Sequence, residues 1–201
     1  MSKPLEIKQS PPNICIVITG TPGVGKSTIS RKVAEKLGFE HIDVSTLVKS
    51  KKFYTEYDEK WDTYYPDEDM LLDYLELQVA DKNLILDWHT NEIYPQRWVN
   101  WVFVIRCPST EILYDRLKAR SYTPEKISEN IDAEIFNVVA DFAEESYDKD
   151  IITELVNETE EDLESNIATI EETIGLLREA LCELSGEYEY EYEEESKEES
   201  E

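Results

Sequence analysis

The chain has few cysteines and no long apolar run. Cys15, Cys107 and Cys182 are the three cysteines among 201 residues, and no C-x-x-C or cysteine–histidine spacing occurs. Such a set provides neither a complete disulfide framework nor a zinc site, so we expect a reducing compartment. No stretch approaches about eighteen apolar residues, and residues 1–12 lack the apolar segment of a secretory signal. These absences predict a protein that is neither secreted nor membrane-spanning.

Basic residues are also scarce. Twenty lysines and arginines face 46 aspartates and glutamates, which gives a formal net charge of −26. We therefore expect no direct sequence-specific binding of nucleic acid and no general attraction to its backbone, whereas a basic protein partner would suit this surface. Residues 185–201 concentrate the excess of acid and predict a disordered acidic tail. Whether this tail tethers a basic partner or only increases solubility stays open.

Glycine is rare too, yet half of the six glycines fall within one short segment. Residues 20–28 read Gly-Thr-Pro-Gly-Val-Gly-Lys-Ser-Thr, which matches the phosphate-loop pattern G-x-x-x-x-G-K-[ST]. An apolar strand, 14–18, precedes the segment, and a helical pattern over 29–37 follows it. In that context the backbone N–H groups and the positive end of the helix converge on one anion. The alternative, a glycine-rich turn that happens to precede a helix, is much less favoured.

The phosphate loop supplies most of the candidate nucleotide-binding residues. Lys26 would reach the β- and γ-phosphates, and the Ser27 hydroxyl would hold a Mg²⁺ ion that accompanies ATP. The full set of loop candidates is Gly20, Gly23, Val24, Gly25, Lys26, Ser27 and Thr28.

Strand and helix patterns alternate through the rest of the chain. The expected strands are 14–18, 39–44, 84–88, 101–105 and 151–152, and the expected helices are 29–37, 45–50 with Ser45 as its cap, 67–79, 112–117, 124–147 and 160–184. Residues 51–66 show no period and are interpreted as a loop or mobile flap. This order predicts an α/β fold with a doubly wound parallel five-stranded sheet over residues 13–184, after a flexible N-terminus at 1–12. Ligands of such a sheet bind at the carboxyl ends of its strands.

Two residues at the end of the strand 84–88 are candidates for catalysis. Asp87 would hold Mg²⁺ directly or through water, although a strand-end acid can also simply cap a turn. His89 could orient a water molecule or the phosphoryl acceptor, since a neutral imidazole accepts a hydrogen bond near pH 7. A structural role for this histidine is about equally favoured.

Three arginines are candidate phosphate ligands. Arg116 and Arg120 lie four residues apart near a helix end, so both could face one ligand, although cations are favoured at that end in any case. Arg120 is the stronger candidate because it enters the following loop, and it is expected to take part in catalysis. Arg97 could hold a second, phosphate-bearing substrate.

Several segments in order resemble one known family. They are the phosphate loop with Thr19, Tyr57-Asp58-Glu59, Asp67-Glu68-Asp69, Asp87-Trp88-His89, Pro95-Gln96-Arg97-Trp98, Arg116-Leu117-Lys118-Ala119-Arg120 and 129–135. Together they resemble the atypical nuclear adenylate kinases, also called adenylate kinase isoenzyme 6 or coilin-interacting nuclear ATPase, over about residues 13–180. The resemblance implies a nucleoside monophosphate kinase fold with a monophosphate-binding flap at about 43–66, to which Asp43, Ser45 and Arg97 would contribute, and a lid at about 119–129.

The resemblance also implies a function. The expected reaction is ATP plus AMP giving two ADP, with a slower ATP hydrolysis that involves His89. It further implies a role in maturation of the small ribosomal subunit, a basic ribosomal protein as partner, and a location in the nucleus and cytoplasm. The chain departs from the family at Arg120-Ser121-Tyr122, where a glycine is usual, so the lid is expected to be stiffer. An ATPase switch or assembly chaperone with incidental kinase activity remains the alternative.

Overall fold

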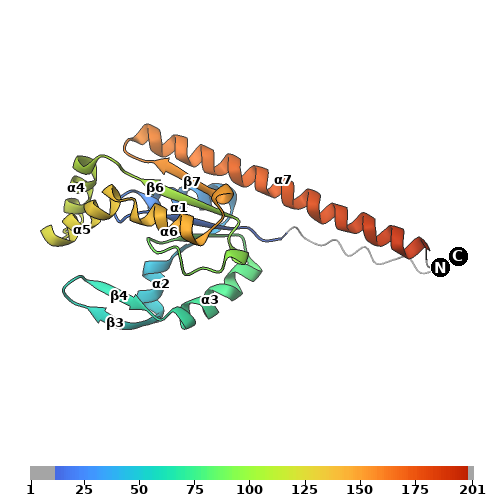
Figure 1. The fold of residues 1–201 in the computed structure, drawn as a ribbon, viewed down its shortest axis with the longest axis horizontal. Helices are drawn as coiled ribbons and strands as arrows, with labels where there is room; N and C mark the ends of the chain where they lie inside the picture. The colour runs from blue at the N-terminus through green and yellow to red at the C-terminus, as the bar shows by residue number, and fades with distance from the viewer. Residues whose placement is uncertain (1–11, 199–201) are drawn as a thin grey trace. The chain divides into compact units, whose positions relative to one another are not determined.

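Five parallel strands form the centre of the molecule in the computed structural model, which describes residues 12–198 and their side chains up to residue 184. Their order is β2-β5-β1-β6-β7. The neighbouring strands β6 and β7 lie side by side in Figure 1. The strands are β1 Cys15–Thr19, β2 Glu40–Asp43, β5 Leu84–Asp87, β6 Trp101–Arg106 and β7 Ile152–Val156. The predicted doubly wound α/β sheet is thereby confirmed.

The apolar runs of the sequence form the central strands of the sheet, and both faces of these strands are covered. Every residue of β1 and β5 is buried, as are Val102–Ile105 of β6. Parallel strands covered on two faces require such uninterrupted apolar sequence. Ile18 of β1 pairs with Asp87 of β5 and with Phe103 of β6, so the carboxyl ends of three strands lie at one edge of the sheet.

Seven α-helices and two short 3-10 helices, Gln96–Trp98 and Lys149–Ile151, occur in the described residues. The α-helices are α1 Lys26–Leu37, α2 Val44–Lys51, α3 Glu68–Asp81, α4 Thr110–Ala119, α5 Pro124–Ile135, α6 Val138–Ser146 and α7 Glu160–Glu198. Several begin at side-chain caps: Asp67 accepts from the N–H of Met70, and Thr123 accepts from that of Lys126. No helix in the described part of the chain is both long and apolar enough to cross a membrane.

The structure corrects four boundaries. The cap of α2 is Asp43, whose carboxylate accepts from the N–H of Thr46 at 2.9 Å, and not Ser45. Residues 51–66 are not a loop, because β3 Tyr54–Asp58 and β4 Thr63–Pro66 form an antiparallel hairpin with packed tyrosines. The single helix expected at 124–147 is two helices, since Asn137 between α5 and α6 adopts a left-handed backbone with φ 57°. β7 is longer than the two residues expected, because it pairs along β6.

The chain divides into two compact units. Residues 13–171 form one compact unit, and residues from Glu172 onward belong to another. The backbone of α7 is helical to Glu198, past residue 184 where the sequence predicted its end. The predicted disorder of tail 185–201 stays a prediction, because the side chains of this segment lie outside the described residues. The predicted flexible N-terminus also lies outside them, except for Pro12.

Candidate functional site

The phosphate loop has a backbone that only glycine adopts readily. Gly20 and Gly25 have φ values of 142° and 105°. A β-carbon on Gly20 would lie 2.2 Å from the carbonyl oxygen of Ile105, and one on Gly25 would lie 2.3 Å from Asn157 Nδ2. The loop therefore packs directly against the ends of β6 and β7 and leaves no room for side chains at these positions.

Lys26 folds back over the loop. Its Nζ donates to the carbonyl oxygens of Gly20 at 2.7 Å and Thr21 at 3.1 Å, and the residue is buried. Burial lowers the pKa of Lys26 from 10.5 to about 8, with Asp87 opposing and Arg120 adding to the effect. An ammonium group held by neutral carbonyls can turn to a polyphosphate, whose negative charge would stabilise its protonated form.

Contacts from distant segments brace the loop. Asn157 Nδ2 donates to the Val24 carbonyl at 2.7 Å, and the Thr21 hydroxyl donates to Glu134 Oε2 at 2.5 Å. Glu134 is 3% exposed and also accepts from Arg106 Nε at 2.8 Å and from the Cys107 N–H at 2.9 Å. Sequence reasoning placed Thr21 and Glu134 only within segments that carry the family resemblance. It assigned no role to Asn157 or Arg106, because nothing in their local pattern marks them.

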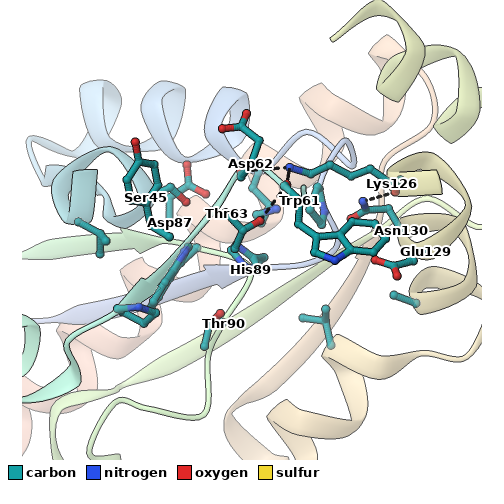
Figure 2. Close-up of a pocket in the computed structure, with 18 of the residues that line it drawn as sticks. Ser45, Trp61, Asp62, Thr63, Asp87, His89, Thr90, Lys126, Glu129 and Asn130 are labelled. Atoms are coloured by element: carbon teal, nitrogen blue, oxygen red, sulfur yellow. Dashed lines mark hydrogen bonds between the residues drawn. The ribbon is translucent and has the colours of Figure 1, made fainter. Parts of the chain in front are cut away.

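A cavity of about 890 Å³ opens beside the loop (Figure 2). It reaches from Lys26 and Ser27 past the end of β5 to the hairpin and to helix α5. Seven predicted site residues line it: Lys26, Ser27, Asp43, Ser45, Asp87, His89 and Arg120. The structure thus brings together candidates from the phosphate loop, from α2 and its cap, from the end of β5, and from the end of α4.

Asp87 lies at the centre of this arrangement and is 3% exposed. His41 Nε2, on the neighbouring strand β2, is 3.3 Å from Asp87 Oδ2 and is close enough to donate a hydrogen bond. A carboxylate and the Ser27 hydroxyl are the hard oxygen donors that Mg²⁺ prefers. In the described residues no group of three or more His, Cys, Asp or Glu side chains could hold a metal. A magnesium ion here would therefore need phosphate or water oxygens as further ligands, which suits an ion that arrives with a nucleotide.

His89 faces the cavity two residues beyond Asp87. Desolvation and then the charges of Lys26 and Lys126 lower the pKa of His89 below its ordinary 6.5, with Asp87 opposing them. The imidazole is therefore neutral at pH 7 and able to accept a hydrogen bond.

Two predicted arginines lie elsewhere. Arg97 is on the surface, with its side chain 69% exposed and paired to Glu76 at 2.8 Å. Arg116 donates to the carbonyl oxygens of Asn157 at 2.8 Å and Glu158 at 3.0 Å, and it does not line the cavity. The expectation that Arg116 and Arg120 face one ligand is wrong. Arg120 lies beyond the last turn of α4, whereas the guanidinium of Arg116 is hydrogen-bonded to the loop after β7.

The remaining loop candidates contribute backbone rather than side chains. The Val24 side chain is fully buried, and Gly23 packs against Leu113 and Leu117 of α4. Thr28 is exposed on α1 and its N–H donates to the Gly25 carbonyl at 3.1 Å. These residues shape the loop but do not line the cavity.

Two segments that the sequence named as flap and lid meet at the cavity. The hairpin contributes Trp61–Pro66 to the lining, and the segment 120–133 contributes Arg120, Tyr122, Lys126, Glu129, Asn130 and Ala133. Figure 2 shows Lys126 reaching from α5 to the backbone at Trp61 and Asp62. Ser121, where the resembled family usually has glycine, adopts a left-handed backbone with φ 61°.

Comparison with known proteins agrees with this geometry. A family model described as AAA domain matches residues 16–137. A Caenorhabditis elegans protein named adenylate kinase isoenzyme 6 homolog is 42% identical over 175 residues, which cover 86% of this chain and 90% of that protein. A Drosophila melanogaster protein of the same name is 43% identical over 155 residues, covering 77% and 88%.

A solved structure supports the fold alone. Shikimate kinase from Bacteroides thetaiotaomicron superposes with a TM-score of 0.55 at 16% identity, covering 81% of this chain and 98% of that one. The resemblance inferred from the sequence motifs is thus confirmed by relatives along most of the chain, and the parallel sheet by a structural neighbour.

Proposed function

Because the chain belongs to the adenylate kinase isoenzyme 6 family, we propose that it is a nucleoside monophosphate kinase that transfers the γ-phosphoryl group of ATP to AMP. The observation that carries this proposal is the single cavity that joins the phosphate loop to the hairpin. A triphosphate bound by Lys26 and the loop amides would point its terminal phosphate toward Asp87 and His89. A monophosphate near Asp43, Ser45 and the hairpin would face that terminal phosphate from the opposite side of the cavity.

The residues act mainly by positioning and by charge. Phosphoryl transfer requires an in-line arrangement of donor and acceptor and neutralisation of the charge on the moving group. Lys26 and Arg120 would supply two positive charges, and the loop N–H groups would hold the remaining phosphate oxygens. Ser27 and Asp87 fit a Mg²⁺ ion, which would add further positive charge at the phosphates when bound. The hairpin and α5 would exclude water, which competes with AMP as acceptor.

We further propose slow ATP hydrolysis at the same site. The neutral His89 ring is exposed to the cavity close to Asp87, where it could accept a hydrogen bond from an attacking water molecule. Since transfer to AMP supplies its own phosphate oxygen as nucleophile, hydrolysis should depend on His89 more strongly than transfer does.

We also propose a partner and a cellular role. The net charge of −26 favours a basic protein, and the family resemblance points to a small-subunit ribosomal protein, to ribosome maturation, and to the nucleus and cytoplasm. The second candidate function is an ATPase switch in which nucleotide binding changes affinity for that partner. It is supported by the same surface charge together with a cavity lined by the hairpin and α5.

One assay separates the two functions. ADP formation from ATP is measured with and without AMP, and phosphate release is measured with and without a basic ribosomal protein. Strong dependence on AMP supports the kinase, whereas AMP-independent phosphate release that the partner accelerates supports the switch. His89→Ala should reduce hydrolysis more than transfer, and equal rates of both reactions in this variant and the parent would refute the role of His89.

A further inference from the structure

Helix α5 and the hairpin are joined at the cavity by Lys126. Its Nζ donates to the backbone carbonyl oxygens of Trp61 at 2.5 Å and Asp62 at 3.3 Å, and it lies 4.7 Å from the centre of the Tyr122 ring. An ammonium group has three N–H donors, so two carbonyls and a ring face occupy most of its capacity. Because the acceptors are backbone atoms, the contact fixes the course of the hairpin rather than the rotamer of one side chain.

The hairpin tip holds its own shape. Asp58 Oδ1 accepts from the N–H groups of Lys60 at 2.9 Å and Trp61 at 3.1 Å. The Tyr57 hydroxyl donates to Asp62 Oδ1 at 2.8 Å. The carbonyls that face Lys126 are thus presented by a preformed turn, and the hairpin would move as one body if this contact were lost.

Other contacts of the hairpin are with α2 and with the edge of the core, against which Tyr54 and Tyr64 pack. The hairpin forms a two-stranded sheet of its own, separate from the central sheet. Its base is fixed by the Asp67 N–H, which donates to the Phe53 carbonyl at 3.0 Å, and by packing of β4 on α2. Isolated two-stranded hairpins are only marginally stable in water, so a contact at the far end has a large influence on position.

The other end of α5 is fixed to the phosphate loop. Lys126 is in the first turn of this helix and Glu134 is in its last turn. Glu134 binds Thr21 of the loop and Arg106 of β6. Lys126 therefore ties the hairpin to a helix that is itself anchored to the phosphate loop.

We propose that Lys126 is a positioning residue that holds the hairpin over the cavity and thereby favours AMP over water as the phosphoryl acceptor. This inference rests on the proposed kinase function. In transfer, the bond from the γ-phosphorus to its bridging oxygen breaks and a bond to an anionic phosphate oxygen of AMP forms, giving two ADP. In hydrolysis the new bond is to a water oxygen that loses a proton, giving ADP and inorganic phosphate. A displaced hairpin would admit water and misplace AMP, so the two rates should respond in opposite ways.

The kinetic test compares three variants. Lys126→Met keeps most of the side chain's length and removes the charge, and Lys126→Arg restores donors. Lys60→Met removes a charge from the exposed tip, where its ammonium lies 4.5 Å from the centre of the Trp61 ring, without touching α5. We measure ADP formed with AMP and phosphate released without it. The ratio of interest is the rate of transfer to AMP divided by the rate of hydrolysis. The loss of hydrogen bonds from a charged group should lower this transfer-to-hydrolysis ratio about tenfold in Lys126→Met. Lys126→Arg should recover most of the ratio, and Lys60→Met should leave it unchanged. A ratio in Lys126→Met equal to that of the parent overturns the inference.

A second measurement needs no nucleotide. Backbone amides of the hairpin should exchange with deuterated solvent faster in Lys126→Met than in the parent or in Lys60→Met, because the tip is released. Unchanged exchange in an enzyme that still transfers to AMP would overturn the role of Lys126 alone. Failure of the parent protein to make ADP from AMP would instead refute the proposed function, and the first assay reports this separately.

Discussion

Glu134→Gln removes a buried negative charge that braces the phosphate loop. The carboxylate is 3% exposed and accepts hydrogen bonds from Thr21, Arg106 and Cys107. An amide in its place keeps the shape but presents N–H donors to a guanidinium and leaves Arg106, whose side chain is 13% exposed, without its buried counter-ion. We therefore expect the folded state to lose stability.

The size of the loss follows from the burial of the pair. Removing one partner of a buried ion pair costs about 3–5 kcal/mol. Arg106 keeps its exposed partner Glu154 at 2.9 Å, so the lower end applies and we expect about 3 kcal/mol. For a chain of this length that corresponds to a fall in Tm of roughly 6–12 °C.

Glu154→Gln provides the matched control. It removes the other carboxylate bound to the same arginine, but this side chain is 49% exposed. Solvent screening leaves such a pair worth about 0–1 kcal/mol. Urea unfolding followed by circular dichroism measures both variants against the parent. If the two variants lose the same free energy of unfolding, within about 0.5 kcal/mol, burial does not distinguish the two carboxylates and the reasoning fails.

Three further predictions follow from backbone geometry and burial. Gly25→Ala should weaken ATP binding, measured by calorimetry, about tenfold or more, because the backbone of Gly25 has φ 105° and an added β-carbon would collide with Asn157. Gly38→Ala is the control: there is open space around Gly38, so this change should reduce stability but leave the affinity for ATP unchanged. Equal losses of affinity in the two variants would contradict this reasoning. Ser121→Gly should raise the free energy of unfolding by about 1 kcal/mol, since glycine adopts φ 61° without strain, and Ser121→Ala should give no gain. Burial raises the pKa of the Cys15 thiol to about 12, so alkylation at pH 8 followed by mass spectrometry should modify Cys15 only as the protein unfolds; fast labelling of the folded protein would be inconsistent with its burial.

The sequence predicted the central sheet and the phosphate loop because both depend on local pattern. Uninterrupted apolar runs bounded by turns indicate strands buried on two faces, and closely spaced glycines before a helix indicate an anion-binding turn. Asp87 and His89 could be placed near the loop because the carboxyl ends of parallel strands share one edge. Relatives that match most of the chain confirm the family that these motifs suggested.

Other predictions failed where local pattern is ambiguous. Residues 51–66 gave no apolar period, because the hairpin forms a two-stranded sheet of its own. Cross-strand tyrosine contacts stabilise it, and Tyr54 and Tyr64 pack against the edge of the core. The long helix at 124–147 was interrupted by Asn137, which has the short polar side chain that tolerates a left-handed backbone. The place of Arg97 in the sequence suggested a ligand for a phosphate-bearing substrate, but its side chain is exposed and pairs with Glu76.

By itself the amino-acid sequence determined that this chain builds a parallel sheet with a nucleotide-binding loop at its edge. The pattern of apolar residues and the spacing of glycines set these local structures within a few residues of the chain. Only the tertiary structure decided what holds that loop and what closes the cavity. Thr21 and Glu134 are 113 residues apart, Lys126 and Trp61 are 65 apart, and His41 and Asp87 are 46 apart. Such pairs leave no trace in local sequence, since their partners are chosen by the packing of whole helices and strands.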